Sequence, residues 1–314
     1  MGKRMKVLFL RGKVDNRTEE VRSLDESSDM WLHLAFALSD DVEVWYWGGE
    51  REHQYASGMV ERWIPDFKRS KLPDYRPDVI VCRGGFPQYQ HVLRRFPRAL
   101  HVYYGAGARY MPDGKYDLCL VDDPQQQQLV QEKYQNTSVQ LWEKPAAPHF
   151  VHRNTNKVYD LCYIANGQQA KIKNVRWVYE TCPEHHLMLH MGYKSQCKVP
   201  LNVVQQRSDR MQMPAKISLC RVGIVPYTTY DSAPRALIEM ASCGLPVVAL
   251  ESTHQHYPSL GIITASVSSF WDVVGEALEK PNSPSEHSKM VRSKVSIDTA
   301  ASRIRTLIAS LWHE

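Results

Sequence analysis

Two carboxylates at a fixed spacing are the clearest chemical feature of the sequence. Asp231 and Glu239 stand eight residues apart within VGIVPYTTYDSAPRALIEMASCGLPVVAL at 222–250. The apolar start of this segment predicts a buried parallel strand, and Pro234 suits the first turn of a helix, where its missing N–H leaves no hydrogen bond unmade. The polar loop 227–233 should therefore lie between the carboxyl end of a strand and a helix N-terminus. Backbone N–H groups and the helix dipole favour a phosphate there.

The side chains around this loop indicate what such a phosphate would carry. Carboxylates are poor phosphate ligands but good acceptors for the hydroxyl groups of a sugar or a ribose. Arg235, one position into the expected helix, could pair with a diphosphate. Taken singly, Glu239 could face solvent and Asp231 could cap the helix. Taken with the loop and with the helix end at Cys243-Gly244, which is followed by Leu-Pro, the two carboxylates favour a functional site.

Length and composition are those of an ordinary globular protein. The chain has 314 residues, enough for two domains of about 150, with 43% hydrophobic and 23% charged residues. Its seven cysteines form no C-x-x-C pair, and Cys82, Cys119 and Cys162 lie in apolar runs. A reducing cytoplasm therefore fits better than a disulfide framework. No apolar run approaches the ~20 residues needed to span a bilayer, and the N-terminus is predicted to be a first strand and not a signal peptide, so we expect a cytoplasmic protein.

Short apolar runs alternate with helical segments along the chain, a pattern typical of βα units around a parallel sheet. In the first half, strands are expected at 6–10, 42–47, 78–82, 100–104, 116–121 and 139–142, with helices at 30–38, capped by Asp29, and at 124–134. In the second half, strands are expected at 159–164, 186–190, 202–204, 222–225 and 246–250, with helices at 174–181, 234–243, 270–278 and 298–311. The segments 14–28 and 51–76 are expected to be long irregular loops, which are more often functional than accidental.

The sequence EKPAAP at 143–148 interrupts this alternation. Two prolines close together make a stiff, extended connector. We therefore expect one α/β domain at 1–147 and a second at 148–297.

The segment at 222–250 resembles the nucleotide-sugar signature of retaining GT-B glycosyltransferases, especially those of family 4. In that signature, two acidic residues with seven residues between them precede a stretch of the form EAMACGLPVVA. Here Asp231, seven residues and Glu239 precede MASCGLPVVA. The resemblance implies that Asp231 stands where the family's first glutamate contacts the donor sugar, and Glu239 where the second holds the ribose hydroxyls. Aspartate is one methylene shorter than glutamate, which bears on the sugar it would prefer.

The resemblance implies an α/β fold of the GT-B type, with two Rossmann-like domains facing each other across a cleft. A C-terminal helix at about 298–314 would pack back on the first domain. The donor would bind the second domain and the acceptor the first, and a hexosyl or pentosyl group would be transferred with retention of configuration. The co-substrate would be a nucleotide-sugar, such as a UDP- or GDP-sugar. We expect no metal and no other cofactor, since the chain lacks the Asp-x-Asp pair of the other large glycosyltransferase fold.

The resemblance also implies which residues grip the diphosphate. The family usually has an arginine and a lysine after the first strand of the second domain. The arginine is missing from IANGQQAKIKN at 164–174, and Lys173 matches the lysine slightly better than Lys171. The candidate site therefore consists of Asp231 and Arg235 as catalytic residues, and of Lys171, Lys173, Ser232, Ala233 and Glu239 as donor-binding residues.

The first domain should meet the acceptor, and it departs from the family pattern. Arg11-Gly12-Lys13 replaces the usual Gly-Gly after the first strand, and YGAGAR at 104–109 replaces a histidine. Residues 51–115 carry 12 basic and 6 acidic side chains, which indicates an anionic acceptor, unless the arginines pair with nearby acidic residues. The acceptor-side candidates are Arg69, Arg94, Tyr104, Gly105 and Arg109.

The identity of the acceptor stays open at this stage. The family's commonest acceptors are sugars. Basic side chains interleaved with aromatic ones, Arg83 among them, could instead grip a polynucleotide, so a phage-type enzyme that glycosylates a hydroxylated DNA base is the alternative. A nucleotide-sugar epimerase and an inactive GT-B binding module are further alternatives. His186 and His190 are better explained as a core or surface pair than as metal ligands, and Gly105-x-Gly107 lacks the third glycine of a dinucleotide fingerprint.

Overall fold

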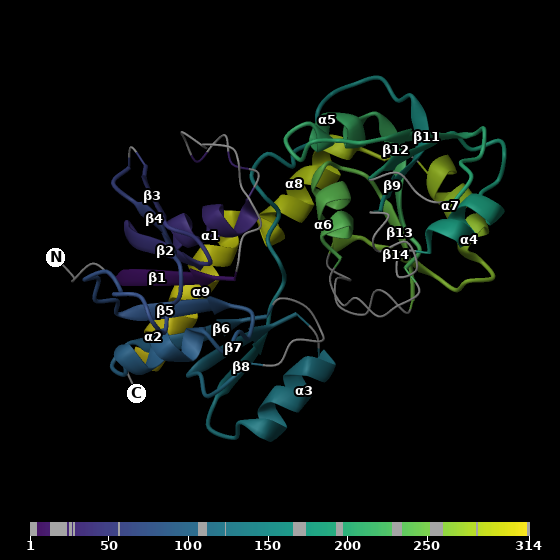
Figure 1. The fold of residues 1–314 in the computed structure, drawn as a ribbon. Coiled ribbons are helices and arrows are strands. Elements are labelled where there is room, and N and C mark those ends of the chain that lie inside the picture. The colour runs from purple at the N-terminus through teal and green to yellow at the C-terminus, as the bar shows by residue number, and fades with distance from the viewer. Residues whose placement is uncertain are drawn as a thin grey trace. The chain divides into compact units, whose positions relative to one another are not determined.

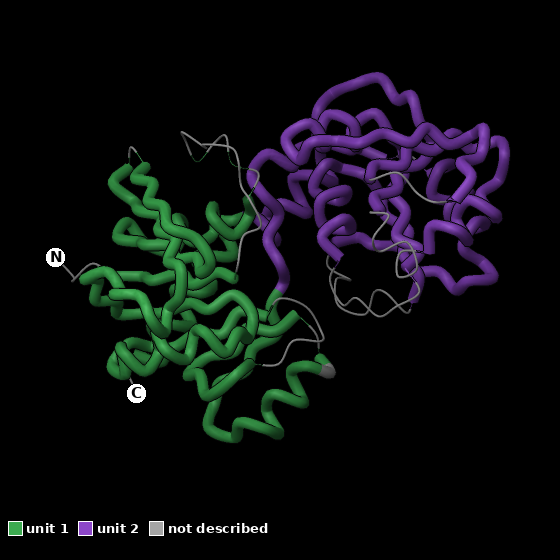
Figure 2. The backbone as a smooth tube through the Cα atoms, in the orientation of Figure 1, with its two compact units in different colours: residues 1–142, 297–314 green, residues 143–296 purple. Residues whose placement is uncertain are grey.

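The computed structural model describes residues 5–12, 24, 27, 29–55, 57–105, 112–122, 124–165, 174–192, 197–227, 234–251, 260–280 and 282–312. The chain forms two compact units (Figure 2). Unit 1 contains Met1–Trp142 and Ile297–Glu314, and unit 2 contains Glu143–Ser296. The division at 142/143 falls at the start of the EKPAAP connector, and the last helix belongs to unit 1.

Unit 1 is built on a sheet whose described strands follow the order β3-β4-β2-β1-β5-β6-β7-β8 (Figure 1). The strands are β1 (Lys6–Arg11), β2 (Asp41–Trp47), β3 (Arg51–Gln54), β4 (Val60–Ile64), β5 (Val79–Arg83), β6 (Leu100–Tyr104), β7 (Leu118–Val121) and β8 (Ser138–Leu141). The helices are α1 (Met30–Leu38), α2 (Tyr89–Arg95), α3 (Pro124–Lys133) and α9 (Ile297–Trp312). Every described strand pair is parallel except β3 with β4 at the edge.

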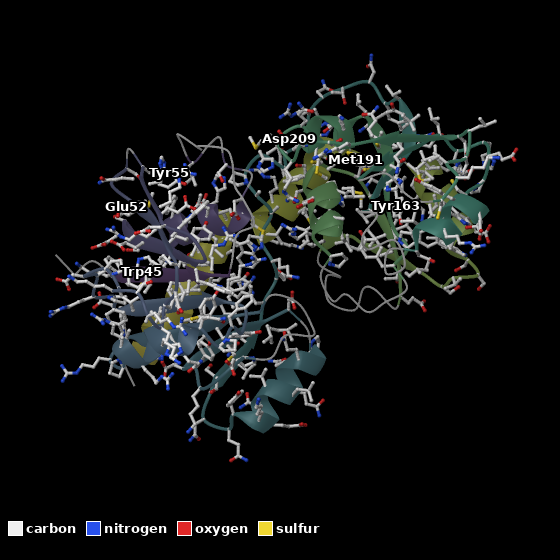
Figure 3. The ribbon with its side chains drawn as sticks, in the orientation of Figure 1. Trp45, Glu52, Tyr55, Tyr163, Met191 and Asp209 are labelled. Atoms are coloured by element: carbon white, nitrogen blue, oxygen red, sulfur yellow. The ribbon has the colours of Figure 1, made fainter. Side chains whose placement is uncertain are left out.

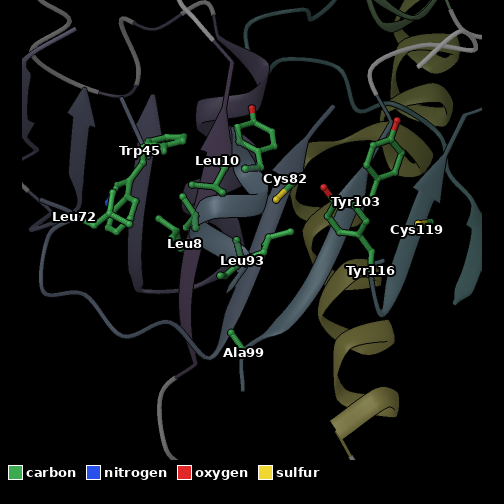
Figure 4. Packing of buried hydrophobic residues seen from close by; sticks show 14 of the residues in the cluster. Leu8, Leu10, Trp45, Leu72, Cys82, Leu93, Ala99, Tyr103, Tyr116 and Cys119 are labelled. Carbon is green, nitrogen blue, oxygen red and sulfur yellow. The ribbon is translucent and has the colours of Figure 1, made fainter. Parts of the chain in front are cut away.

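Apolar side chains cover both faces of this sheet. On one face, Leu8, Leu10 and Cys82 belong to a core cluster that includes Tyr89 and Leu93 of α2 (Figure 4). The connections β1-α1-β2 and β5-α2-β6 run in opposite directions along the sheet. Because such crossovers are right-handed, α1 lies on the other face, where it packs against α9.

The buried cysteines of both units behave as small apolar side chains. Burial raises the pKa of the Cys82, Cys119 and Cys162 thiols, which keeps them protonated and unreactive. This is the role that the apolar runs around them predicted.

Unit 2 is built on a sheet whose described strands follow the order β11-β10-β9-β12-β13-β14, all parallel. The strands are β9 (Tyr159–Ile164), β10 (Met188–Met191), β11 (Val203–Gln206), β12 (Cys220–Val225), β13 (Val247–Leu250) and β14 (Ile263–Ala265). The helices are α4 (Val175–Thr181), α5 (Met213–Ser218), α6 (Arg235–Ser242), α7 (Phe270–Glu279) and α8 (Pro284–Val295). Across both units, no helix in the described part of the chain is long and apolar enough to cross a membrane.

The expectation of an irregular loop at 51–76 is wrong, because β3 and β4 lie within it. Both strands are at the sheet edge and are rich in polar side chains, so no apolar run marks them. Arg62 on β4 forms ion pairs with Glu52 on β3 and with Glu43 on β2, the latter at 3.0 Å. These pairs join three strands at an edge that has little apolar surface to bury.

Three helices were not expected from the sequence. Helices α2 and α5 have only seven and six residues, and neither has a side-chain hydrogen bond at its N-cap, although Pro214 in the first turn of α5 suits a helix start. Helix α8 has the largely polar sequence PSEHSKMVRSKV. The strand expected at 186–190 begins only at Met188, because the backbone N–H of His186 closes a turn onto the Pro183 carbonyl.

The end of α6 yields a first prediction. Gly244 has a φ of 89°, and a Cβ there would lie 2.2 Å from the Pro284 carbonyl oxygen. Gly244→Ala should lower the free energy of unfolding in urea by roughly 3 kcal/mol, because it combines left-handed backbone strain with a backbone clash. Gly275→Ala in α7 is the control: a Cβ there meets nothing within 4 Å, so stability should rise by about 0.5–1 kcal/mol. Equal effects of the two substitutions would contradict this packing.

Candidate functional site

Helix α6 carries the second acidic residue of the sequence motif, and close packing sets its position. Pro234 is its N-cap with a φ of −64° and a ψ of 124°, and the helix occupies Arg235–Ser242. Gly223 on β12 leaves room for this helix, since a Cβ there would lie 2.8 Å from the Met240 sulfur. Every residue of α6 after the first is buried. Glu239 is thereby held inside unit 2.

The Glu239 carboxylate has an arginine as its partner. Its Oε1 accepts a hydrogen bond from Nη2 of Arg210, and the two side chains are 6% and 31% exposed. The Arg210 guanidinium also lies over the buried Phe150 ring, 5.5 Å from its centroid. A carboxylate withdrawn from water needs such a partner. The alternative in which Glu239 faces solvent is therefore wrong.

A turn between β11 and α5 fixes the backbone around Arg210. Asp209, labelled in Figure 3, accepts through Oδ1 a hydrogen bond of 3.3 Å from the Met211 N–H, and its carbonyl accepts one of 3.1 Å from the Met213 N–H. Sequence reasoning missed Arg210. It lies 29 residues from Glu239, and no local pattern connects the two.

Side chains also fix the carboxyl ends of β9, β10 and β12. Tyr227, two residues after the end of β12, is buried and donates a hydrogen bond of 2.9 Å to the Ile164 carbonyl. His190 on β10 donates one of 3.0 Å from Nε2 to the Ala165 carbonyl. Gly192 has no room for a side chain, since a Cβ would lie 1.7 Å from the Ala165 oxygen. The three strand ends are therefore held close together.

The loops that hold most of the predicted donor-binding residues begin at this edge. Ala165 and Tyr227, which precede them, follow two strands that pair with each other, β9 and β12. Arg235 is exposed at the first position of α6. The predicted residues Lys171, Lys173, Asp231, Ser232 and Ala233 lie outside the described residues.

His190 is a neutral core residue and not a metal ligand. The sequence favoured a core or surface position for it. Since a carbonyl can only accept, Nε2 carries the proton given to Ala165, and Nδ1 accepts from the Tyr179 hydroxyl. Burial lowers the pKa of His190, an effect that the hydrogen bond to the Ala165 backbone partly offsets. Among the described residues, no group of three or more His, Cys, Asp or Glu side chains could hold a metal ion.

In unit 1, an arginine and two aromatic rings meet at the carboxyl ends of β5 and β6. Arg83 and Tyr104 are partners in the register of these strands. The half-buried Arg83 guanidinium lies 4.5 Å from the centroid of the Trp31 ring, and Tyr104 packs edge-on against the same ring at 4.7 Å. A cation stacked on a ring here can still meet a ligand, and ligands bind α/β sheets at these strand ends.

A second arginine at this edge is part of the framework. Arg11 ends β1, and its Nη1 donates to the Asp29 carboxylate and, at 2.9 Å, to the Tyr46 hydroxyl. Asp29 also accepts a hydrogen bond of 3.0 Å from the Trp31 N–H, which confirms it as the N-cap of α1. Burial lowers the pKa of Arg11, but Tyr46 and Asp29 more than reverse this, so the pKa is raised overall. The ion pair holds α1, and with it Trp31, at the strand ends.

The structure does not bring Arg94, an acceptor-side candidate, to Tyr104. Arg94 lies in the last turn of α2. Just beyond it, the Phe96 carbonyl is 3.0 Å from Nε2 of His101, at the amino end of β6. Tyr104 is at the opposite end of that strand.

Arg69 and Gly105, two further acceptor-side candidates, have contacts within unit 1 that account for them. Arg69 is 86% exposed and lies 3.8 Å from the Asp66 carboxylate. Gly105 donates a backbone hydrogen bond of 2.7 Å to the Leu120 carbonyl, and a Cβ would lie 3.2 Å from that oxygen. Arg109 lies outside the described residues.

Comparisons with known proteins agree on the fold. The sequence matches no protein-family model and no curated protein. The structure is similar to sucrose-phosphate synthase from Thermosynechococcus elongatus, with a TM-score of 0.70, 10% identity and coverage of 98% of this chain and 99% of that one. It is also similar to a glycosyltransferase from Rickettsia africae, with a TM-score of 0.69, 10% identity and 99% coverage of both chains.

A third similar structure is an E. coli protein described as trehalose-6-phosphate bound with UDP-2-fluoro glucose. The TM-score is 0.63, the identity 9% and the coverage 98% of both chains. Together with the two parallel sheets, these similarities show that the chain has the GT-B fold. This confirms the fold expected from the sequence motif.

His190 yields a prediction for the pH dependence of stability. The neutral ring is favoured in the folded protein, whereas an unfolded histidine has a pKa near 6.5. Its contribution should be complete above about pH 6.5 and should be lost as the pH falls through the lowered pKa of the folded state. His190→Gln should therefore weaken the dependence of the free energy of unfolding on pH between 7.5 and 5. Parallel pH profiles for the two proteins would contradict this.

Proposed function

We propose that the chain is a glycosyltransferase that uses a nucleotide-sugar donor. The observation that carries this proposal is the buried Glu239 carboxylate on α6. It lies next to the carboxyl ends of β9 and β12, where the loops that hold most of the predicted donor-binding residues begin. A buried, oriented carboxylate is a strong acceptor for hydroxyl groups. By the resemblance of the sequence motif, this glutamate accepts hydrogen bonds from the ribose hydroxyls of the donor. By analogy with the GT-B fold, unit 2 binds the nucleotide of the donor.

In this proposal, the charges around the diphosphate do most of the catalytic work. Arg235, the N-terminus of α6 and Lys173 or Lys171 stabilise the negative charge of the departing diphosphate, while Asp231 contacts the transferred sugar. Preorganised hydrogen-bond donors of this kind commonly contribute about 3–4 kcal/mol each. The acceptor hydroxyl attacks the anomeric carbon on the face from which the diphosphate leaves, so that the configuration is retained, and the leaving diphosphate helps to take the proton of that hydroxyl. A UDP- or GDP-sugar is the co-substrate, and no metal takes part.

We propose further that unit 1 binds an anionic saccharide through Arg83, beside Trp31 and Tyr104. A half-buried guanidinium supported by a ring suits a phosphate group, and aromatic rings suit the apolar face of a sugar. The names of two similar structures, sucrose-phosphate synthase and trehalose-6-phosphate, include sugar phosphates. These observations support a sugar phosphate as the acceptor.

A DNA acceptor has less support. Some of the basic side chains at 51–115 have acidic partners: Arg62 pairs with Glu43 and Glu52, and Arg69 pairs with Asp66. A titration with duplex DNA is the direct test. Binding that weakens steeply with salt would favour DNA over a sugar phosphate.

The donor site yields a prediction about its two carboxylates. Glu239→Gln should weaken binding of UDP or GDP roughly tenfold to hundredfold, the worth of a hydrogen bond to a charged group. Asp231→Asn should weaken binding of the nucleotide-sugar but leave the plain diphosphate unchanged. Calorimetry on both ligands measures these effects, with Glu276→Gln on the exposed face of α7 as the control. Equal losses of diphosphate affinity in the two motif variants would refute the assigned roles.

The acceptor site yields a separate prediction. Arg83→Gln should raise the KM for a hexose phosphate about tenfold, because it removes one hydrogen bond to a charged group, and should leave nucleotide affinity unchanged. The control is Arg76→Ala, whose side chain is 88% exposed. Initial rates with a hexose phosphate and with the unphosphorylated hexose show whether the effect of Arg83 depends on the phosphate group. A KM that stays constant, or rises equally for both sugars, counts against a phosphate contact.

A further inference from the structure

We propose that Arg210 is a positioning residue for the donor nucleotide. It holds the Glu239 carboxylate by Oε1 so that Oε2 accepts the hydrogen bonds of the ribose hydroxyls. This inference rests on the proposed function, because it requires that Glu239 meets a ribose.

The first support is the division of labour between the two carboxylate oxygens. Among the described residues, Arg210 is the only hydrogen-bond donor to the Glu239 carboxylate, and it engages Oε1 alone. A carboxylate has two oxygens with about four acceptor positions. The arginine therefore fixes the plane of the carboxylate while Oε2 keeps its capacity to accept.

The second support is that Arg210 is itself held. Phe150, fully buried, lies under its guanidinium, and the Asp209 turn fixes the backbone on both sides. A guanidinium is a planar, rigid fork that is always charged. Because the guanidinium is itself fixed, it orients the Glu239 carboxylate. A flexible lysine would orient the carboxylate less well.

The third support is a contrast within the same unit. Arg221 forms an ion pair of 3.2 Å with Asp160 and donates a hydrogen bond of 2.6 Å to the Leu278 carbonyl. Asp160 is at the amino end of β9 and Arg221 is at the amino end of β12. The loops that hold most of the predicted donor-binding residues begin at the opposite ends of these strands. Arg221 is thus an arginine with a purely structural ion pair, and it serves as the matched control for Arg210.

The experiment is calorimetric titration with UDP, GDP and their 2′,3′-dideoxy analogues. The proteins are the wild type, Arg210→Gln, Arg210→Lys, Arg221→Gln, Glu239→Gln and the double variant Arg210→Gln/Glu239→Gln. For the ribonucleotide that the wild type binds more tightly, Arg210→Gln should weaken binding about tenfold. It should weaken binding of the dideoxy analogue less than twofold. Arg210→Lys should recover part of the loss, and Arg221→Gln should match the wild type with both ligands.

The double variant removes both charges and so leaves no buried charge without a partner. It should bind the ribonucleotide no more weakly than Glu239→Gln alone, because Arg210 acts through Glu239. Equal weakening of ribo- and dideoxynucleotide by Arg210→Gln would overturn the inference, as would additive losses in the double variant. If the wild type binds neither ribonucleotide, the proposed function itself fails, and this inference fails with it.

Discussion

The burial of a charged carboxylate on α6 is the constraint on which unit 2 depends. Gly223 lets α6 approach β12, and Gly244 lets the chain turn directly after the helix, and Glu239 is only 5% exposed in the resulting packing. Removing the partner of a buried charge costs about 3–5 kcal/mol. The turn that carries Arg210 and the Phe150 ring beneath it therefore contribute to the stability of the unit by holding this partner in place.

Unit 1 also contains a buried carboxylate that needs a basic partner. Arg11 and Asp29, 9% and 6% exposed, form an ion pair at the carboxyl ends of the strands and hold the start of α1. This pair supports Trp31, on which Arg83 stacks. In each unit, a buried ion pair supports the strand ends, where α/β sheets bind ligands. The charges that organise the framework are thus distinct from the half-buried arginine that we assign to the acceptor.

The parts of the fold that follow from local sequence were predictable, and those that follow from tertiary contacts were not. Apolar runs such as VLFL and VIVC identified the central strands, because a strand buried on both faces needs apolar side chains throughout. Pro234 and Gly244 bracketed α6 to within one residue at each end. By contrast, β3 and β4 are edge strands stabilised by ion pairs, and their polar sequence has no strand period.

The same distinction applies to the candidate site. Glu239 was identified because its spacing from Asp231 is a local pattern. Arg210 was not, because its contact with Glu239 depends on how α5 and α6 pack. Arg94 and Tyr104 were grouped by charge and chain proximity, but they lie near opposite ends of β6, because α2 runs back along the sheet. Charge density along a sequence does not reveal which end of a strand a side chain occupies.

We propose that a nucleoside diphosphate binds unit 2 at the carboxyl ends of β9 and β12 and at α6. Hydrogen–deuterium exchange with saturating UDP or GDP tests it most directly. We expect slower exchange in peptides covering 160–173, 206–213 and 222–242, with no change in 270–295. Saturable binding that slows exchange only in unit 1, or that leaves 222–242 unchanged, would contradict it.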